Sequence, residues 1–482
     1  MDSTETQTET RNLWGKHPKT NRMKLYVFFM YVIDALVLSF LAVFMNQCQV
    51  DLGWTPWMKS LALGILPFAG VAGILILSVF SGDTKRNLRV LRICMFTVFG
   101  CILIMGFTGL FLGDGISDRG EVNNSTLYYG KYAIFLIMSC LIQALEGGMQ
   151  PCASSVIADV NAQEGTTYGS IYSIISLVYI VSTPIGGLIA GLLKTSRGTF
   201  TGYLIMFLIM SPFALLAALW TWVMGRKKNL GLKDGDISNP EVSSEDGSSS
   251  LQDYLDVFKN KIFVYFMAFT AIYAGIFFAT DSVTSEMWTN IGDVGEGVST
   301  VFTPLNWGLM GSVGCLFELI FLNVATKFMK DDNQKTLMAL CPLLMSVRTA
   351  ALGVLSIFFF NSAAGQDSWV AWVMMALQTL RGTSWGIFNA ANVPMTDRIL
   401  GSKLRQKGVF LIPLLYQVIN GVIQFIFPLI SGIGEGAQSG HLRFVVFFLI
   451  SFLGLVSFLG LILMKNPSAS STKDQKPEEA SE

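Results

Sequence analysis

Two apolar stretches of the chain contain a similar five-residue sequence with opposite charges at the same position. One is Gln143-Ala144-Leu145-Glu146-Gly147 and the other is Gln378-Thr379-Leu380-Arg381-Gly382. Gln143 and Gln378 are as far apart in the sequence as Glu146 and Arg381 are. A lone charge at the centre of a membrane helix costs about 2.5 to 3.5 kcal/mol on insertion scales, so such residues are usually functional or paired. The pattern predicts a two-fold repeated membrane protein with a charged central site.

Both stretches continue the polar pattern at steps of three and four residues, which fall on one face of a helix. An apolar helix turns such a face toward the bundle interior or toward water, because lipid cannot satisfy polar groups. A polar seam that only joins helices is the alternative interpretation. We predict that seven of these residues line a substrate cavity: Gln143, Glu146 and Gln150 in the first stretch, and Gln378, Arg381, Trp385 and Asn389 in the second.

Three further ionisable residues fall inside apolar stretches: Asp34, Glu318 and Arg348. Together with Glu146 and Arg381 they make an inventory of three carboxylates and two guanidiniums. Arginine remains charged, so two carboxylates can be its counter-ions and one is left over. An unpaired carboxyl group in a medium of low dielectric tends to hold a proton. This predicts proton coupling with Asp34 as the proton carrier; an acid that merely shapes its helix is the alternative.

Glu318 and Arg348 lie in consecutive predicted helices that are joined by a short loop. Counting 1.5 Å per residue from the helix ends places the two side chains at similar depths. We therefore predict that they form an ion pair. Such a pair would be either a structural lock within the second half or a part of the proton-coupling network.

Composition predicts a membrane protein. The 482 residues are 52% apolar and 14% charged, whereas a soluble domain has about 25% charged residues. The net charge of zero argues against nucleic acid as a partner. Apolar runs of about 20 residues have the length that a helix needs to cross the hydrocarbon core. We predict twelve such helices, at residues 23–46, 57–81, 89–113, 132–157, 168–193, 201–225, 262–281, 302–326, 336–361, 369–394, 408–433 and 443–465.

The distribution of Lys and Arg predicts the orientation, because these residues accumulate in cytoplasmic loops. They occur in the loops after helices 2, 8 and 10, whereas residues 47–56, 282–301 and 362–368 contain none. Both termini are then expected in the cytoplasm. The predicted organisation is a cytoplasmic segment at 1–22, a six-helix bundle at 23–225, a cytoplasmic linker at 226–261, a second six-helix bundle at 262–466 and a disordered tail at 467–482.

Six plus six helices around a charged linker, with related sequences in helices 4 and 10, resemble the major facilitator superfamily over essentially the whole chain. Three local sequences are similar to its signatures: Gly82–Arg86 after helix 2, Gly148–Ala153 in helix 4, and Ser182–Gly187 in helix 5. The resemblance implies an all-α integral membrane fold of two pseudo-symmetric six-helix bundles. It also implies that the bundles rock about a central cavity that binds solute near the membrane midplane.

Two branches of that superfamily offer local similarities. Met345–Arg348, with Lys335 before it, is similar to helix 9 of the lactose permease branch, where the arginine belongs to the proton-coupling network. Gly147–Cys152 is similar to a motif of the proton-coupled oligopeptide family, with Gln150 in place of its lysine. Neither similarity extends to the substrate-binding residues of its branch, so we keep the general assignment.

The expected function is secondary active transport of a small polar organic solute by alternating access, coupled to protons. A facilitative uniporter or exchanger is one alternative, and a transporter-like receptor or chaperone that does not transport is another. We expect no enzyme activity, cofactor or metal, because His17 and His441 lie outside the apolar stretches and no nucleotide-binding loop occurs. The predicted partners are the solute, protons and the lipid bilayer. We expect a monomer that crosses the plasma membrane many times.

Overall fold

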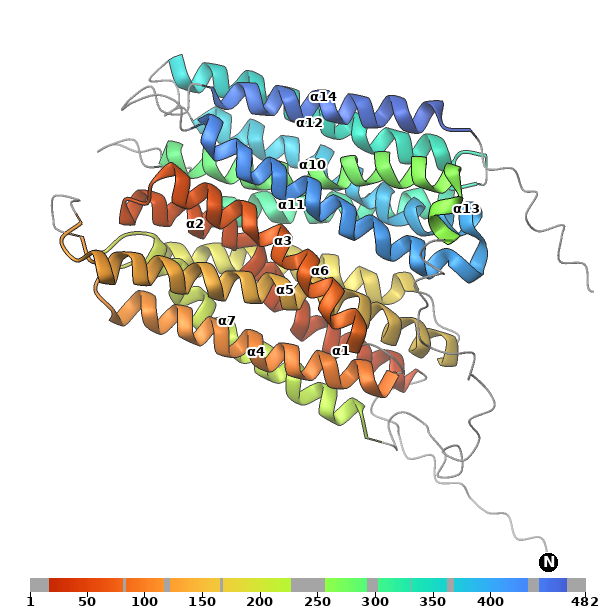
Figure 1. Ribbon diagram of the computed structural model, residues 1–482, viewed down its shortest axis with the longest axis horizontal. Coiled ribbons are helices and arrows are strands. Elements are labelled where there is room, and N and C mark those ends of the chain that lie inside the picture. The colour runs from red at the N-terminus through yellow and green to blue at the C-terminus, as the bar shows by residue number, and fades with distance from the viewer. Residues whose placement is uncertain are drawn as a thin grey trace, which may run out of the picture.

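The computed structural model describes residues 17–80, 84–116, 122–164, 168–226, 256–292, 302–330, 332–361, 368–431 and 442–465. Figure 1 shows two helical bundles that lie side by side, one built from the first half of the chain and one from the second. Each bundle has its own hydrophobic core.

The first bundle contains six membrane-spanning helices. The first of them runs continuously from Pro18 to Leu52 and has a π-helical turn in its middle. The segments of this bundle are α1 (Pro18–Ile33), η1 (Asp34–Leu38), α2 (Ser39–Leu52), α3 (Pro56–Phe80), α4 (Thr84–Phe111), α5 (Ser125–Glu164), α6 (Tyr168–Leu192) and α7 (Phe200–Met224). Below, the end of the molecule where α1 begins is called the N-terminal side, and the end where α2 finishes is called the opposite side.

The second bundle repeats this arrangement with α10 (Lys261–Gly292), α11 (Pro304–Phe328), α12 (Gln334–Asn361), α13 (Ser368–Ser431) and α14 (Arg443–Leu463). α13 consists of two helices, because Gly401 within it has φ 73° and ψ 168°, a backbone conformation that glycine adopts easily. Ten helices of the described chain are long and apolar enough to cross a membrane, and Leu411–Phe427 is a shorter apolar helix. The predicted fold class, twelve helices in two bundles, is confirmed.

Several helices are longer than the hydropathy pattern predicts. α5 covers Ser125–Glu164 where 132–157 was expected, and α10 extends to Gly292 where the prediction ended at residue 281. Hydropathy marks only the part of a helix that lies in hydrocarbon, whereas the backbone gains by continuing its internal hydrogen bonds into the interface. The beginning of the predicted loop 282–301 is therefore helical. Most of the predicted linker and the whole predicted tail lie outside the described residues.

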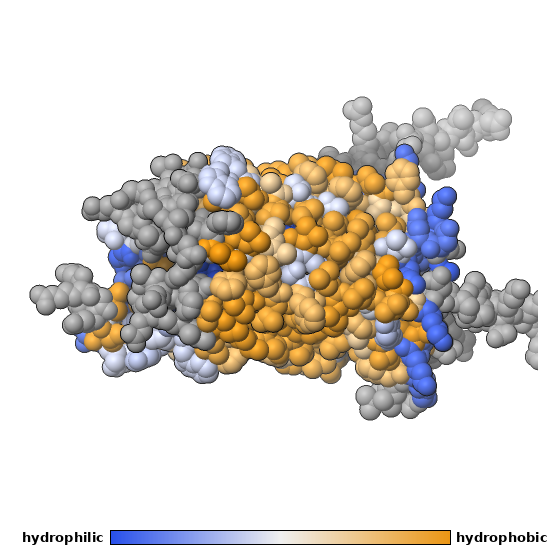
Figure 2. All heavy atoms as spheres, turned by 90° about the horizontal axis from the view of Figure 1, so that it is seen from above, coloured by the Kyte–Doolittle hydropathy of each residue, from blue (hydrophilic) through white to orange (hydrophobic). Residues whose placement is uncertain are grey.

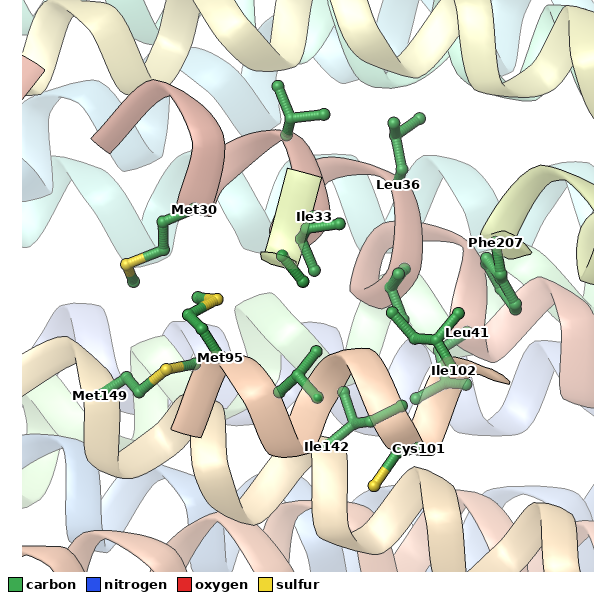
Figure 3. Packing of buried hydrophobic residues seen from close by; sticks show 14 of the residues in the cluster. Met30, Ile33, Leu36, Leu41, Met95, Cys101, Ile102, Ile142, Met149 and Phe207 are labelled. Carbon is green, nitrogen blue, oxygen red and sulfur yellow. The ribbon is translucent and has the colours of Figure 1, made fainter. Parts of the chain in front are cut away.

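The surface and the interior both fit a membrane environment. In Figure 2 a broad hydrophobic band separates two polar ends of the molecule. Many large apolar side chains are exposed, among them Phe80, Phe111 and Leu463, which is favourable only where lipid rather than water covers them. Inside the first bundle, Figure 3 shows Met30 of α1 beside Met95 and Met149.

On the opposite side of the first bundle, Asp114 follows the end of α4 and binds one cation from α5 and one from the loop between α6 and α7. Its carboxylate accepts hydrogen bonds from Lys131 at 2.5 Å and from Arg197 Nε at 2.8 Å. Both cations also donate to the Leu112 carbonyl just beyond α4, where helix carbonyls lack internal partners. Burial alone would raise the pKa of Asp114, but the hydrogen bonds from Arg197 and Lys131 outweigh it and lower the pKa.

We expect Asp114→Asn to reduce the free energy of unfolding by about 2 kcal/mol, because both cations lose a charged acceptor. The folded-state pKa is lowered, so the contribution is complete above the ordinary aspartate pKa of about 3.9 and is lost only at still lower pH. The difference from wild type should thus stay constant between about pH 5 and about pH 8. Unfolding of the purified protein in detergent measures it.

Asp256→Asn is the matched control, because Asp256 pairs with Lys259 at the surface. Such an exposed pair contributes about 0.5 kcal/mol or less. An equal effect of the two substitutions would contradict the role given to Asp114.

Candidate functional site

The polar centre of the first bundle is built around Asp34, the first residue of the π-helical turn η1. Single π-turns inside α-helices occur frequently at functional sites. Asp34 is buried and accepts a hydrogen bond of 2.5 Å from the hydroxyl of Tyr179 in α6. A carboxyl group is thus held in the middle of the first membrane-spanning helix.

Glu146 of α5 is also buried and lines the same small cavity as Asp34. Two neighbouring carboxyl groups in a low dielectric oppose each other's ionisation, which favours a pair with one proton and one negative charge. Other ionisable groups that face the two residues are Tyr179, Cys315 of α11 and Tyr416 of α13. We call Asp34 and Glu146 the carboxyl pair.

A small cavity adjoins the carboxyl pair. Its volume is about 10 Å³, taken as the space open to the centre of a water-sized probe, which is room for about one water molecule. Its walls come from three helices of the first bundle and are otherwise apolar: Met30, Ile33, Val37, Leu38, Met95, Val98, Ile142 and Met149. The cavity can hold water beside the acids but is too small for an organic solute.

The polar centre of the second bundle is an ion cluster of Asp281, Arg348 and Arg381. Arg381 of α13 donates to Asp281 of α10 from Nε at 2.8 Å and contacts it from Nη2 at 2.6 Å. Arg348 of α12 reaches the same carboxylate from Nη2 at 3.4 Å. The Arg381 guanidinium also lies over the ring of Phe277, 4.6 Å from its centroid. One carboxylate therefore holds two guanidiniums from two other helices.

The members of this ion cluster differ in exposure and in hydrogen bonding. The Asp281 side chain is 31% exposed and that of Arg381 is 19% exposed, whereas Arg348 is completely buried behind them. Nε and Nη1 of Arg348 have no hydrogen-bond partner among the described residues. The Asp281–Arg381 pair is thus the accessible part of the cluster.

The predicted ion pair between Glu318 and Arg348 is wrong. The structure pairs Arg348 with Asp281, while Glu318 accepts a hydrogen bond of 3.3 Å from Asn389. Our inventory omitted Asp281 because it stood at the end of predicted helix 262–281, where a charge can reach water. In the longer α10 the residue lies well inside the helix. The centre therefore contains four carboxyl groups and two guanidiniums.

The repeated sequence motif has a structural explanation in the glycines that follow its charged residues. A Cβ atom added to Gly147 would lie 2.8 Å from the carbonyl oxygen of Gly70 in α3. One added to Gly382 would lie 1.9 Å from the carbonyl oxygen of Gly314 in α11. Both bundles thus use glycine for the same close helix contact. This contact sets the position of the neighbouring charged residue.

The remaining predicted cavity residues have different surroundings. Gln143 lies beside Gly70 and the buried Gln378 beside Gly314, at the helix contacts within each bundle. Gln150, one turn beyond Glu146 toward the N-terminal side, is exposed. Trp385 stacks on Phe277 at a centroid distance of 4.3 Å. The stripe thus leads from helix contacts through the charged centre to an exposed end on the N-terminal side.

A third polar cluster joins the two bundles on the opposite side. Lys59 in the first turn of α3 forms a buried ion pair of 3.0 Å with Glu286 of α10, and Arg443 of α14 is 3.8 Å from Glu286. Next to them, Asn46 of α2 donates to Ser285 at 2.7 Å. The sequence analysis missed these residues, although Lys59 lay within a predicted span. We call the Lys59–Glu286 and Asn46–Ser285 contacts the interbundle lock.

Comparisons with known proteins agree with this architecture. Residues 27–418 match the sequence profile of the Major Facilitator Superfamily. A curated protein of Bacillus subtilis (strain 168), the uncharacterized transporter YclF, is 24% identical over 191 residues, which are 36% of this chain and 37% of that protein. The match therefore spans little more than a third of that relative's length.

Two solved structures have a similar fold. The nucleoside transporter NupG superposes with a TM-score of 0.64 at 13% identity and covers 92% of this chain and 98% of its own. The D-xylose-proton symporter gives a TM-score of 0.63 at 15% identity, with 94% and 98% covered. At this level of identity the similarity concerns the fold alone.

The ion cluster predicts unequal effects of removing its two accessible members. Asp281→Leu should reduce the free energy of unfolding by about 3 to 5 kcal/mol, because it leaves the buried Arg348 and the partly buried Arg381 without their carboxylate. Arg381→Leu should cost less, since Arg348 remains beside Asp281. Thermal unfolding in detergent measures both, with Asp256→Leu at the surface as the control. Equal losses would show that Arg348 does not share the carboxylate.

The interbundle lock predicts that charge reversal opens the opposite side. Lys59→Glu places a second carboxylate against Glu286, and like charges at this distance repel. A cysteine introduced at the buried Ser285 should then react with a maleimide at least tenfold faster. The double variant Lys59→Glu/Glu286→Lys should return the rate to its original value.

Lys85→Glu is the matched control, because Lys85 is exposed on the N-terminal side. The parent without the introduced cysteine corrects for reaction of the natural cysteines. An unchanged rate in Lys59→Glu would show that the ion pair does not hold the bundles together.

Proposed function

Because the chain belongs to the Major Facilitator Superfamily, we propose that it is a secondary active transporter that moves a small polar organic solute by alternating access and is coupled to protons. The observation that carries the proposal is the pairing of two polar centres. A carboxyl pair lies inside one bundle and an accessible ion cluster inside the other.

The carboxyl pair suits proton coupling. It holds two buried acids on the wall of one cavity of the size of a water molecule. The pair carries one proton, and it can gain a second proton or lose the first as the accessibility of the site changes. Asp34 is the proposed proton carrier, with Glu146 as its partner and Tyr179 as the donor that orients it.

The ion cluster and the residues around it are the proposed solute site. The Asp281–Arg381 pair is accessible, and Trp385 borders it through the stack on Phe277. Glu146 connects the two parts, because it lies within electrostatic range of Tyr416 of the second bundle. Asn389 and Glu318 form the hydrogen bond next to Arg381.

The contacts between the bundles indicate which state the protein occupies. The interbundle lock lies on the opposite side, and the contact of Thr183 in α6 with Gly308 and Ser312 in α11 lies in the same half of the molecule. The polar stripe is exposed toward the N-terminal side at Gln150. We therefore interpret the structure as closed on the opposite side and open toward the N-terminal side.

The basic loops support an orientation with the N-terminal side in the cytoplasm. On this basis the described state faces inward, both termini are cytoplasmic and residues 226–261 are a cytoplasmic linker between the bundles. A single chain contains both polar centres, so we propose that a monomer is sufficient for transport, in the plasma membrane. The names of the two structural relatives suggest nucleosides and pentoses as compounds to be included in a screen.

Transport by the purified protein in proteoliposomes with an imposed pH gradient tests the proposal. The screen contains nucleosides, pentoses, amino acids and carboxylates, with empty liposomes as the reference. Accumulation that collapses with a protonophore supports proton coupling. Uptake that only equilibrates the solute indicates a facilitator or exchanger, and a complete lack of movement would favour a receptor.

Asp34→Asn should abolish accumulation driven by the pH gradient, because the carboxyl pair then has only one titratable member. Exchange of labelled for unlabelled solute across the membrane should persist, since this reaction needs no net proton movement. The surface substitution Asp256→Asn should leave both activities unchanged. Accumulation by Asp34→Asn at the wild-type level would reject Asp34 as the proton carrier.

A further inference from the structure

The ion cluster of the second bundle is incompletely bonded. Arg348 is fully buried and uses one of its nitrogen atoms, at 3.4 Å, while Nε and Nη1 have no hydrogen-bond partner among the described residues. Buried polar groups without partners are costly and call for an explanation. Asp281 lies close enough to supply the missing bonds, but its two oxygens are turned to Arg381.

The Asp281 carboxylate shows what Arg381 is able to bind. Its Oδ2 atom lies 2.8 Å from Nε and 2.6 Å from Nη2 of Arg381, and its Oδ1 atom accepts from Nε at 3.1 Å. This edge of the guanidinium can also bind a carboxylate in a forked geometry. The contact is 19% exposed on the arginine and 31% exposed on the aspartate. A solute that enters the centre therefore meets this pair before it can reach Arg348.

We infer that the solute carries a single carboxylate, which displaces Asp281 from Arg381, while Asp281 moves to Arg348 and one proton joins the carboxyl pair. This inference deepens the proposed function, on which it rests. The exchange keeps the number of ion pairs: Arg381 takes the carboxylate of the solute in place of Asp281, and Arg348 gains a closer carboxylate partner on one edge of its guanidinium.

The proton follows from the balance of charges in the centre. The second bundle contributes two guanidiniums and the Asp281 carboxylate. Glu318 is counted as neutral, because it is buried and forms no ion pair among the described residues, and burial favours the neutral acid. The carboxyl pair with one shared proton contributes one negative charge. The sum is zero, so a bound monoanion would leave a net negative charge in a low dielectric unless the carboxyl pair takes up a second proton.

Among the described residues, the groups near the carboxyl pair offer this proton no other acceptor. The ionisable neighbours are Tyr179, Cys315 and Tyr416, which are neutral hydroxyl and thiol groups. The cavity walls contributed by α1, α4 and α5 are otherwise apolar. The binding of one anion and the uptake of one proton are therefore linked, and transport of the two together moves no net charge.

Aromatic side chains define the rest of the solute site. Phe277 lies under the guanidinium of Arg381 at 4.6 Å and stacks on Trp385 at 4.3 Å. Phe278 and Tyr416 stack at 5.2 Å beside them. These rings offer apolar faces next to the anion position, so the inferred solute combines a carboxylate with an apolar or ring-shaped body.

Matched pairs of acids and amides test the inference on the full-length protein in detergent. The probes are acetate, lactate and benzoate against acetamide, lactamide and benzamide, and binding is followed by the shift in thermal unfolding. At least one carboxylate should bind at least tenfold more tightly than its amide. Binding should be accompanied by the uptake of one proton per anion, measured with an indicator dye in weakly buffered solution.

Substitutions distinguish a binding role of the cluster from a structural one. Arg381→Gln should weaken carboxylate binding at least tenfold, whereas Asp281→Asn should bind at least as tightly as wild type, because the internal competitor is removed. The double variant Asp34→Asn/Glu146→Gln, which removes both acids of the carboxyl pair, should bind the anion without taking up the proton. Arg89→Gln at an exposed position of α4 is the matched control. The proton measurement on wild type remains decisive even if a variant does not fold.

The inference is overturned if no carboxylate of the panel binds, if an amide binds as well as its acid, or if no proton is taken up. The proposed function is judged separately in proteoliposomes. Proton-driven uptake of neutral solutes without any effect of carboxylates would reject the anion site and retain the transporter. If no solute of either kind moves, both proposals fail. Carboxylate uptake that changes with membrane potential would reject the one-to-one balance.

Discussion

The structure depends on the balance of charges inside a medium of low dielectric. A membrane-embedded charge is stable only when a counter-charge or a proton compensates it. Here each compensation joins different helices: Asp281 of α10 holds arginines from α12 and α13, and Asp34 of η1 meets Glu146 of α5. These polar contacts therefore fix helix positions that apolar packing alone would leave adjustable.

The glycine contacts explain why the two charged residues occupy equivalent places. Gly147 approaches the backbone of α3, and Gly382 approaches that of α11, so each bundle brings the same pair of helices together beside its charged residue. The repeat thus preserves a backbone contact, while the side chain before each glycine has diverged to opposite charge. The fold therefore places an acidic residue in one bundle and a basic residue in the other at equivalent positions beside this backbone contact.

The sequence was sufficient for the helices, the two bundles and the centrally placed charges, because apolar length and a spacing of three or four residues report local geometry. It was insufficient for the partners of those charges. Asp281 and Glu286 lie in a polar part of α10. Hydropathy assigned the first to the end of a helix and the second to a loop. This part is helical because Lys59, Asn46 and Arg381 satisfy its side chains from other helices. Such partners are distant in sequence, and without them the wrong pairing of Glu318 with Arg348 was the natural choice.

Alternating access requires contacts that can be exchanged at little net cost. The α6–α11 contact consists of backbone held close by Gly187 and Gly308, and small residues allow such surfaces to tilt while they remain packed. The interbundle lock is different, because opening it separates a buried ion pair, which is costly unless water or another charge replaces the partner. A ligand shifts such an equilibrium only by its different affinity for the two states. On the proposed mechanism, anion and proton supply this difference together, since either alone would leave an uncompensated charge in the centre when the opposite side opens.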